Sequence, residues 1–71
     1  MSEWPSVKGR ELLRVLIRNG WNVKRTTGSH KVLSKAGHED FVFAFRDSEE
    51  IGPRMLARIG RATGLHPEDM R

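Results

Sequence analysis

The chain has 71 residues, a length that permits one small domain and excludes a second. Its core should be thin, because a domain of this size buries only about 60% of its unfolded surface. It contains no cysteine, so neither a disulfide nor a thiolate zinc site can reinforce the core. Thirteen Lys and Arg against nine Asp and Glu leave a formal net charge of +4, which favours an anionic partner, most often a nucleic acid.

The N-terminal residues 1–8, which include Pro5, predict a flexible leader, followed by a domain at residues 9–66 and a short tail at residues 67–71. Trp4 is the one residue of this leader that can fold back onto the domain. No apolar run approaches the roughly 18 residues of a membrane span, and residues 1–6 lack the apolar region of a signal peptide. We therefore expect a soluble, cytoplasmic protein without a membrane partner.

Residues 9–19 predict the first helix. Apolar residues recur at helical spacing and form one stripe: Leu12, Leu13, Leu16 and Ile17. Arginines recur at i, i+4 and i+8 and form a second, basic stripe: Arg10, Arg14 and Arg18. Gly20 supplies the left-handed residue that ends a helix at its C′ position.

Three antiparallel strands are expected next, at residues 21–26, 30–34 and 41–45. Trp21 and Val23 are expected to share the core face of the first strand. In the second strand the pattern leaves open whether Val32 or Leu33 points inward.

The third strand has the strongest signal, because three Phe alternate with small residues and should place their rings on one face, against the helices: Phe41, Phe43 and Phe45. The alternative is an aromatic platform that stacks RNA bases.

The second helix opens at Gly52-Pro53 and ends at Gly64. Its apolar side is expected to consist of Met55, Leu56, Ile59 and Ala62, and its basic stripe of Arg54, Arg58 and Arg61. Gly60 costs about 1 kcal/mol relative to Ala in a helix interior, so a close approach of another element would explain it. The order of elements predicts an α+β fold, an α-β-β-β-α sandwich with two helices on one face of a three-stranded antiparallel sheet.

The candidate site is the stretch Thr27-Gly28-Ser29-His30 between the first two strands. The Gly-Ser pair predicts a tight hairpin that holds His30 at the start of a strand. Histidine titrates near neutral pH and is the side chain best suited to move protons there. Lys24, Arg25 and Lys31 surround it in sequence and should attract phosphate. The alternative is a surface histidine in a turn with no function.

Four segments resemble the HicA (YcfA-like) family of bacterial toxins over residues 8–65: Gly9-Arg10-Glu11-Leu12-Leu13, Asn19-Gly20-Trp21, Gly28-Ser29-His30 and Gly64-Leu65. The resemblance implies a fold related to double-stranded RNA-binding domains, the ribosome-independent mRNA endonuclease activity of a toxin of a toxin–antitoxin system, and neutralisation by a HicB-like antitoxin. It also implies that His30 is the catalytic residue. Ala44 and Arg46 depart from the Pro and His common in the family, and an acidic loop follows them.

RNA cleavage of this kind uses the 2′-hydroxyl of the substrate as nucleophile, so the protein needs a proton carrier and positive charge at the phosphate. His30 is the expected carrier. The expected RNA-binding residues are Lys24, Arg25, Gly28, Ser29 and Lys31. We expect cleavage without a metal or other cofactor, a cyclic 2′,3′-phosphate product, and no cleavage of DNA.

Two other interpretations stay open. A metal site would draw on two groups of residues, His38, Glu39 and Asp40, and then Asp47, Glu49 and Glu50, although neighbouring residues on a strand point to opposite faces. Alternatively, the protein binds RNA without cutting it, either through the two arginine stripes or as a degenerate toxin kept for regulation. Gly52-Pro53-Arg54 lacks the Lys cluster typical of duplex binding.

Overall fold

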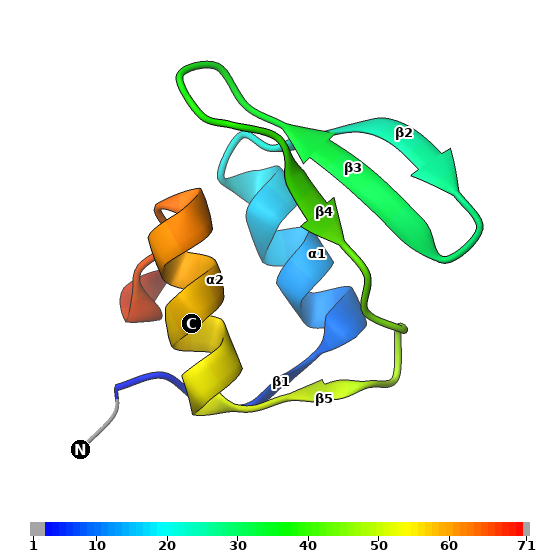
Figure 1. Ribbon diagram of the computed structural model, residues 1–71. Coiled ribbons are helices and arrows are strands. Elements are labelled where there is room, and N and C mark those ends of the chain that lie inside the picture. The colour runs from blue at the N-terminus through cyan, green and yellow to red at the C-terminus, as the bar shows by residue number, and fades with distance from the viewer. Residues whose placement is uncertain (1–2, 71) are drawn as a thin grey trace.

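The computed structural model describes residues 3–70, and its two long helices pack on one face of a three-stranded antiparallel sheet (Figure 1). The elements in chain order are β1 (Val7–Lys8), α1 (Gly9–Arg18), β2 (Asn22–Thr27), β3 (His30–Ser34), β4 (Phe41–Phe43), β5 (Glu50–Ile51), α2 (Pro53–Thr63) and the 3-10 helix η1 (Pro67–Met70). The predicted α+β class and sandwich are confirmed. Residues 1, 2 and 71, the ends of the predicted leader and tail, lie outside the described residues.

The three-stranded sheet has the order β2-β3-β4. Leu33 of β3 is fully buried whereas Val32 is partly exposed, so Leu33 is the residue that points toward the helices. β2 is the edge strand farther from α2 (Figure 1), and all six of its residues are exposed. The outer half of the β2–β3 hairpin therefore extends beyond the core.

A β-bulge interrupts the pairing of β2 with β3. Val23 pairs with Leu33, but Arg25 pairs with Val32, so Lys24 is one extra residue on β2. Trp21 is buried as predicted. Val23 pairs with the buried Leu33 and so lies on the predicted core face, but it is 43% exposed. Val23 stands opposite a core residue, yet it lies on the edge strand, where no helix covers it.

A second, two-stranded sheet was not expected. Val7 pairs with Ile51 and Lys8 with Glu50, and both Val7 and Ile51 are buried. The predicted leader thus ends in two residues that belong to the fold, and Trp4 packs against the core as well. Strands of two residues show no periodicity, so this pairing left no sequence pattern.

The two helices bury narrower stripes than their apolar residues suggested. α1 buries Leu12, Val15 and Leu16, while Ile17 is 49% exposed. α2 buries Leu56, Ile59, Gly60 and Thr63, whereas Met55 and Ala62 are exposed. The Thr63 hydroxyl donates to the Ile59 carbonyl at 2.7 Å, so this buried polar group has a hydrogen-bond partner. Neither helix of residues 3–70 is long and apolar enough to span a bilayer.

The three phenylalanines belong to the core, as predicted, although β4 ends at Phe43. Phe43 is 1% exposed, and Phe41 and Phe45 pack against the buried cluster. The rings of Phe43 and Phe45 meet edge to face, with centroids 5.3 Å apart, a favourable arrangement for aromatic pairs. These rings therefore fill the space under the sheet and do not form a platform for RNA bases.

Gly60 is explained by the indole of Trp4 and the backbone of Leu65, and not by a second helix. A Cβ atom at Gly60 would lie 2.7 Å from Cζ2 and 2.8 Å from Cη2 of Trp4, and 2.9 Å from the Leu65 carbonyl oxygen. The helix ends are as predicted, since Gly20 and Gly64 adopt φ values of 100° and 79°, which glycine reaches without strain. The N-terminal segment is thus fixed on α2 by a position that only glycine fits.

Candidate active site

The β2–β3 hairpin holds His30 in a defined position. Thr27 pairs with His30, so only Gly28 and Ser29 form the turn. Gly28 has φ 58°, and no other residue type within 3–70 has a positive φ, which is the pattern of a type II′ turn with Gly at its first central position. His30 is therefore held in place as the first residue of β3, next to a solvent-exposed two-residue turn.

His30 lies on the outer face of the sheet, away from the helices. Side chains alternate along a strand, and since Leu33 points inward, His30 and Val32 point outward. Arg25 pairs with Val32, two residues from His30, so Arg25 is the diagonal neighbour of His30, at a typical distance of about 7–8 Å. The bulge at Lys24 produces this arrangement, because without it Arg25 would lie on the opposite face.

Lys24 is held by an ion pair. Its Nζ lies 2.8 Å from Oδ2 of Asp40, and both side chains are about half exposed. Asp40 directly precedes β4, so the pair links β2 to β4 across β3. Exposed ion pairs contribute at most about 1 kcal/mol, which means that a phosphate can replace Asp40 at little cost.

The other predicted binding residues divide between the two faces. Gly28 and Ser29 are exposed in the turn beside His30. Lys31 pairs with Phe43, so it points to the helix side of the sheet, and it is partly buried. The structure thus brings Arg25, Gly28 and Ser29 to His30, and separates Lys31 from them by the thickness of the sheet.

Thr27 belongs to the predicted stretch, where no role was assigned to it, and the structure places it directly opposite His30. Asp40 was not predicted as part of this site. It restrains Lys24, and no sequence signal could show this contact, because the two residues lie 16 positions apart, one on β2 and the other just before β4.

Three of the six residues considered as metal ligands make other contacts with their side chains. The His38 ring packs against Trp21 with centroids 5.5 Å apart, Asp40 pairs with Lys24, and the Glu49 carboxylate accepts a hydrogen bond from the Arg46 backbone N–H at 3.1 Å. Within residues 3–70, no three His, Asp or Glu side chains come together as metal ligands would.

A comparison with protein families identifies a family that covers most of the chain. The family described as HicA toxin of bacterial toxin-antitoxin matches residues 9–65 of the 71-residue chain, a segment that contains α1, the whole three-stranded sheet and α2. A comparison with curated proteins finds no match. Membership of such a family implies a cognate antitoxin as partner. Because the match covers most of the chain, the protein belongs to the HicA toxin family of bacterial toxin–antitoxin systems.

Proposed function

We propose that this toxin is a ribosome-independent endoribonuclease that cleaves mRNA without a metal ion, and that His30 is its catalytic residue. The observation that carries the proposal is the position of His30: exposed on the outer sheet face, fixed by the β3 ladder and diagonal to Arg25. A rigid, accessible imidazole beside a cation suits proton transfer at a phosphodiester. An mRNA substrate requires that the reaction takes place in the cytoplasm.

The reaction begins with attack of a 2′-oxygen on the adjacent phosphorus. A bond forms between the 2′-oxygen and phosphorus, and the bond from phosphorus to the 5′-oxygen breaks. One proton leaves the 2′-hydroxyl and one is added to the departing 5′-oxygen; His30 carries out one of these transfers and water the other. The products are a 2′,3′-cyclic phosphate and a 5′-hydroxyl, which accounts for every atom.

The neighbouring residues bind the phosphate. The Arg25 guanidinium, on the same face, balances the charge that builds up on the phosphorane oxygens. Lys24 leaves Asp40 and binds a phosphate of the RNA. The backbone N–H groups of the Gly28-Ser29 turn lie close to the same RNA strand and donate to its phosphate oxygens. Lys31, on the opposite face, contacts only RNA that passes around the rim of the sheet. A HicB-like antitoxin that covers the His30 face would block the phosphate contacts of Arg25 and of the Gly28-Ser29 turn together.

His30→Ala tests the proposal, with His66→Ala as the matched control because His66 is also exposed but lies beyond α2. We expect His30→Ala to lower the rate of transcript cleavage by about 10²–10⁴-fold and to abolish growth arrest, with an unchanged unfolding temperature. His66→Ala should behave as the wild type. EDTA should have no effect, and a 2′-deoxy nucleotide at the cut site should prevent cleavage.

The proposal is wrong if His30→Ala cuts transcripts at the wild-type rate. A wild-type protein that binds RNA and leaves it intact would instead identify an RNA-binding module without chemistry.

A further inference from the structure

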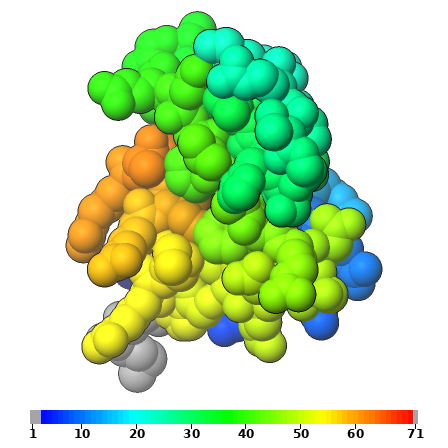
Figure 2. Space-filling view, turned by 45° about the vertical axis from the view of Figure 1, so that its right-hand side comes forward, coloured from blue at the N-terminus to red at the C-terminus, as the bar shows by residue number. Residues whose placement is uncertain are grey.

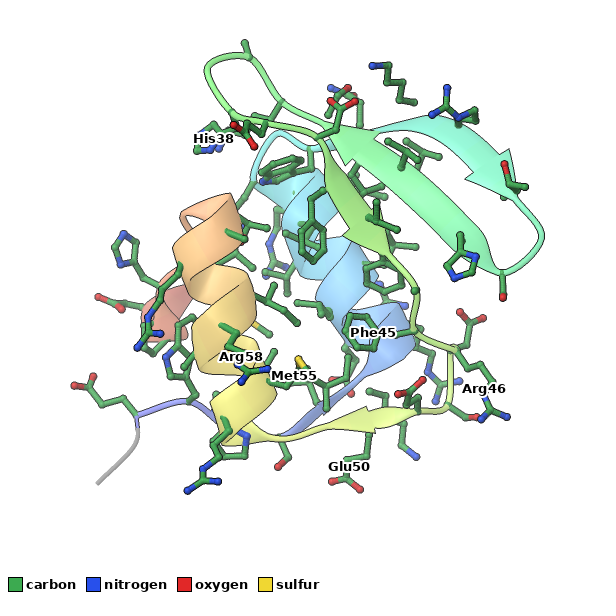
Figure 3. The ribbon with its side chains drawn as sticks, in the orientation of Figure 1. His38, Phe45, Arg46, Glu50, Met55 and Arg58 are labelled. Carbon is green, nitrogen blue, oxygen red and sulfur yellow. The ribbon has the colours of Figure 1, made fainter. Side chains whose placement is uncertain are left out.

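α2 carries a second cationic surface, distant in sequence from the hairpin. Arg54, Arg58 and Arg61 are all exposed, and together with Met55 and Ala57 they line an open hollow on the surface of the helix. Figure 3 shows Arg58 and Met55 on this side of α2. We call Arg54, Arg58 and Arg61 the α2 arginine face.

The α2 arginine face is not neutralised by the protein. α2 contains no acidic residue, and the ion pair found within residues 3–70 is that of Lys24 with Asp40. Seven positions separate Arg54 from Arg61, which corresponds to about 10 Å along a helix. Arg54 and Arg58 are four positions apart and Arg58 and Arg61 three, spacings at which like charges slightly destabilise a helix. A bound anion would offset this repulsion.

The equivalent stripe on α1 differs in this respect. Arg10, Arg14 and Arg18 have the same kind of spacing, but Glu11 shares their helix. Arg18 also donates to the Asp69 carbonyl at 3.3 Å, and η1, which contains Glu68 and Asp69, packs on α1. The sequence offered two similar basic stripes, and their surroundings differ: η1 with its two acidic residues packs on α1, whereas α2 itself carries no acidic residue.

The chemistry of the α2 arginine face suits single-stranded RNA. Guanidinium groups bind phosphate oxygens through two parallel hydrogen bonds and stack on exposed bases. Met55, 41% exposed, adds an apolar surface for a base or ribose. Figure 2 shows α2 (yellow to orange) and the β2–β3 hairpin (cyan to green) on one side of the molecule with β4 between them, so one RNA strand can cross β4 and contact both.

We propose that the α2 arginine face binds the sugar–phosphate backbone of the RNA strand that is cut at His30. This inference rests on the proposed function and extends it, because it assigns a substrate-binding surface outside the hairpin. The surface holds the strand and takes no part in the proton transfers. Its loss should therefore raise KM and leave kcat unchanged.

The test compares two double variants that each remove two charges, Arg58→Gln/Arg61→Gln on α2 and Arg10→Gln/Arg14→Gln on α1. Both are made in the full chain carrying His30→Ala, and binding to a single-stranded RNA is measured over a range of salt concentrations. Loss of two phosphate contacts should lower the slope of log K against log salt by about 1.4 and weaken binding about tenfold near physiological salt. The α1 variant should keep the parent slope.

Three results would overturn the inference. Equal losses in both variants would show a general effect of net charge, and no loss in the α2 variant would show that RNA does not contact this face. Unchanged RNA binding with loss of neutralisation by the cognate antitoxin would assign the face to that protein. Binding to single-stranded DNA of the same sequence is measured as well, because DNA has the phosphates but no 2′-hydroxyl. The α2 variant should again lose more affinity than the α1 variant, and this result does not depend on whether His30 cleaves RNA.

Discussion

Replacing Gly9 by Ala should destabilise this protein strongly, although Gly9 is the first residue of a helix and its φ is not positive. A Cβ atom at Gly9 would overlap the carbonyl oxygen of Arg46, and it would lie 3.1 Å from the carbonyl carbon. These are backbone atoms, so no side-chain rotation relieves the overlap. The loop between β4 and β5 must move away from the start of α1.

The cost follows from the contacts that this movement disturbs. The Gly9 N–H donates to the Glu49 carbonyl at 2.8 Å, and the Arg10 N–H donates to the Asp47 carbonyl at 3.1 Å. Two weakened hydrogen bonds cost about 1 kcal/mol each, and overpacking adds about 1–3 kcal/mol. The higher helix propensity of Ala offsets about 1 kcal/mol. The net loss of about 2–4 kcal/mol is a large part of the roughly 4–11 kcal/mol available to a chain of this length.

Urea and thermal unfolding followed by circular dichroism measure this loss. For a domain of this size, 1 kcal/mol corresponds to about 4–8 °C, so the Tm should fall by at least about 8 °C. Gly52→Ala is the matched control, because Gly52 precedes α2 and has nothing within 4 Å of its added Cβ; it should change stability by less than about 0.5 kcal/mol. A Gly9→Ala protein as stable as Gly52→Ala would refute the reasoning.

Three further predictions test other contacts. Gly60→Ala should lower the free energy of unfolding by about 1–2 kcal/mol despite its better helix propensity, because the methyl group would lie 2.7 Å from the Trp4 ring; urea unfolding should show that Trp4→Ala recovers part of this loss, and no recovery would contradict the packing argument. Asp40→Asn should release Lys24 and so raise the affinity for RNA a few-fold at low salt, and it should change the free energy of unfolding by less than about 1 kcal/mol. An unchanged affinity would show that Lys24 does not bind RNA. Gly28→Ala and Gly37→Ala should lower the free energy of unfolding by a similar amount, about 1–2 kcal/mol, since both glycines have a positive φ and no atom within 4 Å of an added Cβ. Only Gly28→Ala should slow transcript cleavage. Equal cleavage rates in the two variants would show that the Gly28-Ser29 turn is not part of the site.

Local patterns predicted most of the architecture correctly. Glycines at helix ends, the two helical periodicities and the alternating phenylalanines each act within a few residues, so α1, α2 and the three main strands were found close to their observed limits. Helix faces were predicted less well. Ile17 and Met55 are exposed because the buried stripe depends on how each helix packs against the rest of the fold. An apolar residue at the margin of a stripe can therefore be buried or exposed.

The candidate site was predicted as a set of neighbours in sequence, and the structure sorted them by face. His30 and the Gly28-Ser29 turn were evident from the hairpin pattern. Alternation within β3 separates Lys31 from His30, and this would have followed from the sequence once Leu33 was known to point inward. The face on which Arg25 lies could not have been predicted from the sequence, because it depends on a bulge in the pairing of β2 with β3.

The sequence by itself determined the types of the main elements, the turn that holds His30 and the family, because each is written in residues close together along the chain. Only the tertiary structure decided the pairing of Val7–Lys8 with Glu50–Ile51, the face on which Arg25 lies, and which arginine stripe lies beside the acidic residues of η1. These features depend on strand register and on contacts between distant segments. A shift of one residue in register reverses the face of every side chain that follows, and no local pattern in this chain fixes that choice.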